Sequence, residues 1–166
     1  MDVCFENVGS LELKAVVEMR YRMNLKSICA WVVAYLLVGA YFLRSFLMGN
    51  SYLITPIIGF VFAAIMALSP YLRVRKGWKQ SLAFHDGKLP VNTARFGENI
   101  SVENAEGSRN WEYYQLVKVR SFKYSYCLCF GDKTVLLLYR DHFTKGTFEE
   151  FKQFLRMKRP DLKIPE

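Results

Sequence analysis

Two long apolar runs constrain the fold of this chain more than any other feature. The first, Ser27 to Leu43, has 17 residues without a formal charge and would reach roughly 26 Å as an α-helix. The second, Ser51 to Leu72, has 22 uncharged residues and would reach roughly 33 Å. Arg44 can extend toward the membrane surface, which lengthens the first run to Met48. We therefore predict a transmembrane hairpin at residues 27–72, with helices at 27–48 and 51–72.

A cleaved signal peptide is the alternative explanation for the first run. The run begins only after 26 residues, and no small-residue cleavage site precedes the second run. Neither run contains an acidic, basic or histidine side chain, which ion and proton pathways usually need. The pattern therefore favours a membrane anchor over a signal peptide or a transporter.

Positive charges predict the orientation of the hairpin. Lys and Arg concentrate on both outer flanks, whereas the connection between the runs holds only Arg44. Cytoplasmic flanks of membrane helices carry such an excess, so both termini are expected in the cytoplasm. The flanking residues are Lys14, Arg20, Arg22 and Lys26 before the hairpin, and Arg73, Arg75, Lys76 and Lys79 after it.

Small residues at four-residue spacing predict how the two helices pack. Ala30 and Ala34 share this spacing in the first helix, as do Gly59, Ala63 and Ala67 in the second. Pro56 is expected to loosen or kink the second helix near its start.

The segment before the hairpin, residues 1–26, predicts a short strand at residues 2–8 followed by a helix. That helix would run from Ser10 to Met23, with Ser10 as its N-cap. The sequence leaves open whether this segment packs on the membrane surface or on the C-terminal domain.

Residues 73–166 predict a domain of antiparallel strands closed by one helix. Turn sequences such as Gly131-Asp132, expected to form a two-residue hairpin loop, separate the strands. Thr147 to Glu150 has the form of a capping box, and Pro160 ends the helix. We expect an α+β domain, a curled sheet or partly open barrel capped by the helix, as in a pleckstrin-homology (PH)-like domain. The predicted strands are Trp78–Phe84, Val91–Phe96, Ile100–Asn104, Arg109–Phe122, Tyr124–Phe130 and Lys133–Tyr139.

The run from Phe96 to Leu155 resembles the C-terminal domain of the YcxB-like proteins, small bacterial membrane proteins. The resemblance rests on Phe96 to Ile100, then on Trp111, and on Leu136 to Arg140. Further matches are Leu116, Val119, Phe143, Phe148, Phe151 and Leu155. The family places a transmembrane pair before this domain, so the resemblance implies a PH-like fold at the bacterial plasma (inner) membrane. It implies no activity and no catalytic residues.

No residue pattern in the chain predicts catalysis, a metal site or a cofactor. His85 and His142 fall on separate turns or strand ends, and no nucleotide-binding or zinc-protease motif is present. Cys127 and Cys129 are two residues apart, a spacing that predicts reduced thiols on one strand face. The chain is accordingly expected not to be an enzyme.

Basic and aromatic residues supply the candidate binding surfaces. The formal net charge is +8, and residues 73–166 hold 18 Lys and Arg against 11 Asp and Glu, which favours anionic partners. Arg73, Arg75, Lys76 and Lys79 are candidate contacts for anionic lipid, although membrane orientation alone explains them. Lys88 and Arg95 are weaker candidates for a headgroup pocket. Most of the aromatic set is expected in the core: Trp111, Tyr113, Tyr114, Phe122, Tyr124, Tyr126 and Phe130.

These features predict a membrane-anchored interaction or scaffold module that presents a PH-like domain at the cytoplasmic face. Its expected partners are membrane lipids and either another protein or a second copy, with neither nucleic acid nor a small-molecule substrate. Two alternatives stay open: an anionic-lipid-sensing or regulatory membrane protein, and an immunity-type protein that neutralises a membrane-acting toxin.

Overall fold

The computed structural model describes residues 4–49 and 54–165, which form two compact units. One is a helical unit, Val16–Gln80. The other is a sheet unit made of the residues up to Ala15 together with those from Ser81 onward. The sheet unit thus takes its strands from both sides of the helical unit in the sequence.

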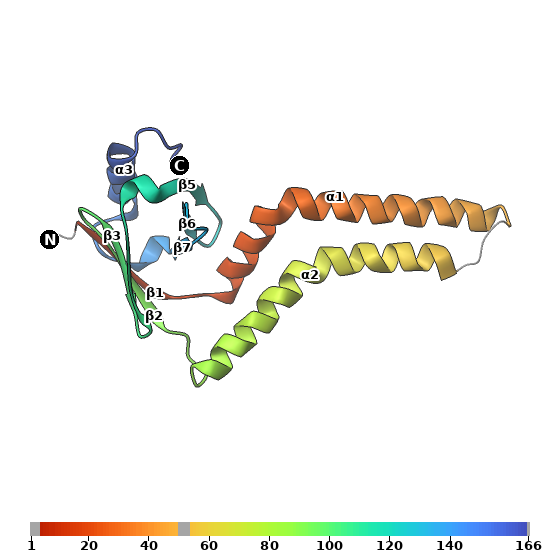
Figure 1. The fold of residues 1–166 in the computed structure, drawn as a ribbon, viewed down its shortest axis with the longest axis horizontal. Coiled ribbons are helices and arrows are strands. Elements are labelled where there is room, and N and C mark those ends of the chain that lie inside the picture. Colours follow the sequence, from red (N-terminus) through yellow and green to blue (C-terminus); the bar gives the residue numbers. More distant parts are fainter. Residues whose placement is uncertain (1–3, 50–53, 166) are drawn as a thin grey trace. The chain divides into compact units, whose positions relative to one another are not determined.

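Two helices, α1 (Leu13–Leu47) and α2 (Ile54–Phe84), form the helical unit. Helix α1 begins shortly before the unit, and α2 ends shortly after it. They run antiparallel, side by side (Figure 1). Both are long and apolar enough to span a membrane. Within their most apolar stretches, only 6% of α1 and 17% of α2 is buried, so neither helix is the core helix of a soluble domain.

Helix α1 is longer than the sequence predicts, because the expected N-terminal helix and the first apolar run form one element. Ser10 ends a strand, and α1 begins at Leu13, so the expectation that Ser10 caps the helix was wrong. The segment from Leu13 to Val38 lacks Gly and Pro and is rich in Leu, Met, Lys, Arg and Ala. These residues sustain a helix, and extending a helix is easier than nucleating a second one.

Helix α2 extends to Phe84, so the prediction of a strand at Trp78–Phe84 was wrong. Here too, extending an existing helix is easier than starting a new element. Lys79, Gln80, Leu82 and Ala83 favour a helix that is already formed. Asp86 and Gly87 then end it: both have a positive φ, 50° and 84°, and the Gly87 N–H donates to the carbonyl of Leu82 at 2.7 Å. Glycine is common at such helix ends because it adopts positive φ without steric strain.

The two helices contact each other through their backbones at Gly39 and Gly59. A Cβ atom at Gly59 would lie 2.7 Å from the Gly39 Cα, so only glycine fits there without a shift. Ala63 is also buried, which confirms the predicted face of α2. On α1, however, Ala30 and Ala34 are exposed, and the predicted face was wrong. The contacting face of α1 instead includes Gly39 and Tyr35, whose ring stacks on Phe62 with a centroid distance of 5.5 Å.

The prolines of α2 act differently from the prediction. Pro56 lies in the first turn, where its missing N–H interrupts no helical hydrogen bond, so no kink is expected there. Pro70 lies inside the helix, which bends in its middle part (Figure 1). Proline removes a hydrogen bond and its ring crowds the carbonyl four residues earlier, a common cause of helix kinks.

The described residues of the sheet unit form eight antiparallel strands in two sheets. The five-stranded sheet has the order β4-β3-β2-β1-β8, and the three-stranded sheet has the order β5-β6-β7. The first sheet contains β1 (Phe5–Ser10), β2 (Val91–Phe96), β3 (Ile100–Asn104), β4 (Gly107–Trp111) and β8 (Phe143–Lys145). The second contains β5 (Leu116–Ser121), β6 (Tyr126–Phe130) and β7 (Val135–Leu138).

Strands β2 and β3 have the predicted bounds, but two predictions in this unit were wrong. The expected strand Arg109–Phe122 is broken by a 3₁₀ turn, η1 (Tyr113–Gln115), which lets the chain pass from one sheet to the other. The expected two-residue loop at Gly131-Asp132 has three residues, because the Phe130 N–H bonds the Thr134 carbonyl at 2.9 Å. Lys133, and not Gly131, has a positive φ, 67°, which identifies the bulged form of hairpin loop.

Strand β1 pairs with β2 over six residues, from Phe5 opposite Phe96 to Ser10 opposite Val91. This pairing answers part of the question that the sequence leaves open: the strand of the N-terminal segment belongs to the sheet, whereas the segment from Leu13 onward is part of α1. Asn7 fixes β1 further: its buried side-chain amide donates to the Tyr139 carbonyl at 2.7 Å and accepts from the Tyr139 N–H at 3.4 Å.

Helix α3 (Phe148–Lys158) covers the core of the sheet unit. The predicted capping box is present: Thr147 accepts from the Glu150 N–H at 3.3 Å, and the Glu150 carboxylate accepts from the Thr147 N–H at 2.9 Å. Phe151 and Leu155 are fully buried. The Phe151 ring lies 4.5 Å from that of Phe96 on β2, so this helix completes the core between the sheets.

Candidate membrane-surface site

The four candidate lipid contacts, Arg73, Arg75, Lys76 and Lys79, are all exposed on α2. At about 3.6 residues per turn they occupy an arc of about 160°. Tyr71, Val74 and Trp78 occupy the opposite arc and are half-buried. This part of α2 therefore has a cationic face, here called the basic face, and each charge near an anionic bilayer would contribute about 1 kcal/mol.

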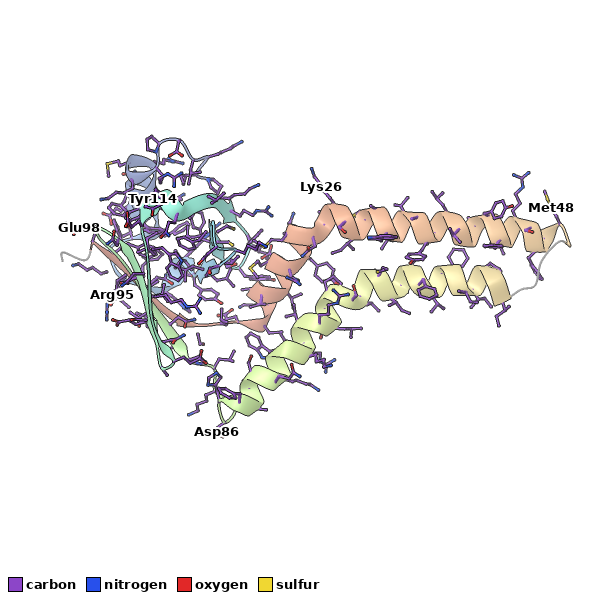
Figure 2. The ribbon with its side chains drawn as sticks, viewed as in Figure 1. Lys26, Met48, Asp86, Arg95, Glu98 and Tyr114 are labelled. Carbon is purple, nitrogen blue, oxygen red and sulfur yellow. The ribbon has the colours of Figure 1, made fainter. Side chains whose placement is uncertain are left out.

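Helix α1 adds further exposed basic residues, among them Arg20, Arg22 and Lys26, the last of which is labelled in Figure 2. Arg22 lies 4.0 Å from the Glu18 carboxylate one turn earlier. Arg20 instead lines an interhelical cleft together with Arg73 of α2. From the sequence, Arg20 is expected only to orient the hairpin, because no local pattern shows that it lies beside a residue so distant in the chain.

Of the weaker candidates, Lys88 and Arg95, the arginine is already engaged within the sheet. Arg95 on β2 (Figure 2) bonds Glu6 on β1 at 2.9 Å and Glu103 on β3 at 2.6 Å. The hydrogen bond from Arg95, followed by one from Thr144, holds the pKa of Glu6 below its usual range. Arg95 therefore ties three neighbouring strands together and carries no spare charge for a ligand.

The two histidines lie in different surroundings. His85 Nε2 lies 2.9 Å from the Glu106 carboxylate. The His142 ring lies 5.0 Å from that of Tyr139, and its buried Nδ1 has no hydrogen-bond partner among the described residues. No group of three or more His, Cys, Asp or Glu side chains within residues 4–49 and 54–165 is arranged to hold a metal ion.

Cys127 and Cys129 lie on one face of β6 with their sulfur atoms 3.7 Å apart. Cys127 is buried and Cys129 is partly exposed. The hydrogen bond from the Cys127 thiol lowers the pKa of Cys129 to about 7, and the charges of Arg120 and Lys118 act in the same direction. The same hydrogen bond, together with burial, raises the pKa of Cys127. Cys129 is therefore the reactive thiol of the pair.

Most of the aromatic set belongs to the core, as predicted. Trp111, Tyr113, Phe122, Tyr126 and Phe130 are buried. Burial raises the pKa of Tyr126 to about 12, so its hydroxyl stays neutral at physiological pH. Tyr114 and Tyr124 are 69% and 40% exposed, which makes them the members of the set available for surface contacts.

Comparison of the chain with protein-family models, with curated proteins and with solved structures finds no match. The resemblance to the YcxB-like proteins therefore stays a prediction, and the case for a function rests on the residues themselves.

Proposed function

We propose that this chain is a non-enzymatic, membrane-anchored interaction module. Its hairpin crosses the bacterial plasma membrane twice and holds a PH-like domain at the cytoplasmic face. The observation that carries the proposal is the pairing of two strands: β1, which precedes the hairpin in the sequence, pairs with β2, which follows it. Because strands that precede and follow the hairpin belong to one sheet, both ends of the hairpin must lie on the same side of a bilayer.

The surface of the hairpin supports the membrane assignment. Large apolar side chains point outward, among them Leu37 at 66% and Ile54 at 65% exposed. Such a surface is unfavourable in water and suits lipid. The small residues Gly39, Gly59 and Ala63 lie inside the helix contact, as in membrane helix pairs, where close backbone packing replaces the hydrophobic effect.

The arrangement of the sheet unit supports the PH-like assignment. Two antiparallel sheets enclose one core, and the C-terminal helix places Phe151 and Leu155 in it. Tyr114 and Val117, 69% and 59% exposed, lie where the chain crosses between the sheets. Exposed aromatic and aliphatic side chains at one place favour protein contacts. We propose that this surface binds a protein partner or a second copy of the chain.

Cysteine labelling tests the topology. In a chain without the native cysteines, Met48→Cys should react with a membrane-impermeant maleimide in intact cells. Lys163→Cys should react only after the cells are opened. The reverse pattern, or release of the chain from membranes by alkaline carbonate, would contradict the anchor.

Photo-crosslinking tests the interaction role. A benzophenone amino acid at Tyr114 or Val117 should give one defined crosslinked band in membranes. The control position Glu98, which is exposed in the turn between β2 and β3 (Figure 2), should give none. Failure to crosslink at both test positions, together with a monomeric protein in detergent, would contradict the interaction module.

Binding of anionic lipid is a second candidate function, favoured by the basic face of α2. If it is the main function, the detergent-solubilised chain should bind phosphatidylglycerol in preference to phosphatidylcholine. Selectivity should then persist at high salt, because simple charge attraction is screened within about 8 Å at physiological ionic strength. Binding that salt abolishes would indicate that these charges only orient the hairpin.

A further inference from the structure

The cleft between α1 and α2 has a volume of about 230 Å³ and lies beside Pro70. Pro70 lacks an N–H, so the Met66 carbonyl loses its helical partner. Ser69 Oγ donates to that carbonyl at 3.1 Å. The Tyr21 hydroxyl of α1 donates to the next carbonyl, that of Ala67, at 2.8 Å. The bent backbone is thus held in place by side-chain hydrogen bonds.

The α1 wall of the cleft changes from charged to apolar along the helix. Its lining residues fall on one face, within about 100° of arc, and extend over roughly 16 Å of helix axis. Arg20 stands at one end, and Trp31 stands at the other. Between them lie Asn24, Ser27 and Ile28.

The α2 wall has the same gradient in the same direction, because the helices are antiparallel. Arg73 lies at the charged end and Met66 at the apolar end, with Ser69 and Pro70 between them. Neither Arg20 nor Arg73 forms an ion pair within the described part of the chain. The cleft therefore holds two uncompensated guanidinium groups, three polar side chains and an apolar end.

The order of polarity in this cleft matches that of a phospholipid at the membrane surface. A phosphate accepts paired hydrogen bonds from guanidinium groups. The Ser27 hydroxyl suits the glycerol oxygens, whereas Asn24 and Ser69 already donate to the carbonyls of Arg20 and Met66. Tryptophan is common at the depth where headgroups meet acyl chains. The volume fits a headgroup but not whole acyl chains, which would stay in the surrounding lipid.

We propose that the cleft lined by Arg20 and Arg73 binds the phosphate of an anionic phospholipid headgroup. This inference rests on the proposed membrane anchor. It differs from simple attraction by the basic face of α2, because it requires Arg20 and does not require Arg75 or Lys79.

Native mass spectrometry of the full chain in detergent tests this site with phosphatidylglycerol, phosphatidylcholine and inorganic phosphate. Phosphatidylglycerol should bind roughly tenfold or more tightly than phosphatidylcholine, and Arg20→Gln with Arg73→Gln should remove that preference. The matched control, Arg22→Gln with Arg75→Gln, removes the same charge from outside the cleft and should keep it. Ser27→Phe, which fills the cleft and keeps both arginines, should weaken binding as the double variant does.

Three results would overturn the proposal. Equal losses in both double variants would show attraction by surface charge alone. Equal binding of the two lipids would show that the cleft does not select a charged headgroup. Complete displacement of lipid by millimolar inorganic phosphate would identify a site for soluble anions. A failure of this site is distinguished from a failure of the anchor by carbonate extraction of cell membranes that contain the same variants. The anchor alone decides whether the chain stays in those membranes.

Discussion

The helical hairpin and the sheet unit place the same kinds of residue in opposite positions. In the hairpin, large apolar side chains such as Leu37 point outward, and Gly39 and Gly59 occupy the contact. In the sheet unit, Phe96, Tyr126 and Phe151 are fully buried, and small residues lie at turns. The proposed membrane anchor accounts for the difference: water drives large apolar groups inward, whereas helices in lipid associate through close packing.

The two units also differ in how far apart in sequence the partners of their backbone hydrogen bonds lie. Each helix bonds its own carbonyls, so its hydrogen bonds are local. Strand β1 instead finds its partner β2 only after the whole hairpin has been made. The sheet unit therefore depends on contacts between distant parts of the sequence, and the variants below should affect the units separately.

Replacing Phe151 with alanine should have the largest effect and should be confined to the sheet unit. Phe151 is fully buried against the rings of Phe5, Phe96 and Phe143. Its loss should lower the free energy of unfolding by about 3–5 kcal/mol. Hydrogen exchange resolved by mass spectrometry should show lost protection in the strands and unchanged protection in residues 16–80. The control Met157→Ala, at a residue 74% exposed on the same helix, should change stability by less than about 0.5 kcal/mol.

Gly59→Ala should weaken the hairpin and leave the sheet unit unchanged. The new Cβ would lie 2.7 Å from the Gly39 Cα, and overpacking of this kind costs about 1–3 kcal/mol. Titration with SDS, followed by energy transfer between labels on α1 and α2, measures the loss. Gly77→Ala in the same helix meets no atom within 4 Å and should be neutral or stabilising, by up to about 1 kcal/mol. Equal effects of the two substitutions would contradict the proposed helix contact.

Asn7→Ala tests whether the strand before the hairpin is secured to the rest of the sheet unit. It would leave the buried Tyr139 carbonyl without its side-chain donor and should cost about 1–3 kcal/mol. Exchange should rise first in β1 and its neighbours. Asn110→Ala, at an exposed position on β4, is the matched control. Unchanged protection of β1 would show that the strand pairing alone holds it.

Alkylation of Cys129 should depend on pH with a midpoint near its pKa of about 7, because the thiolate is the reacting form. A chain with Cys4 and Cys29 replaced by serine isolates the pair. Cys127→Ser should shift the midpoint, since the thiol that donates to Cys129 is replaced. Cys127→Ala should raise it clearly, because no donor remains. A midpoint that neither substitution changes would assign the effect to Arg120 and Lys118 alone.

Several elements could be predicted from the sequence because local residues decide them. The apolar runs predicted two long helices, the bounds of β2 and β3 were correct, and the capping box at Thr147 correctly marked the start of α3. The sequence failed where a neighbouring element decided the outcome. Trp78–Phe84 has strand-favouring aromatic residues only at its two ends and continues helix α2, and η1 breaks an expected strand where the chain changes sheets.

By itself, the sequence determined which segments are long and apolar, where positive charge gathers, and where helix α3 begins. These features depend on composition and on spacing along the chain. Only the tertiary structure decided that β1 belongs to the sheet after the hairpin, that Gly39 contacts Gly59, and that Arg20 shares a cleft with Arg73. Each of these pairs residues far apart in sequence, and such partners are chosen by packing and hydrogen bonding that no local pattern encodes.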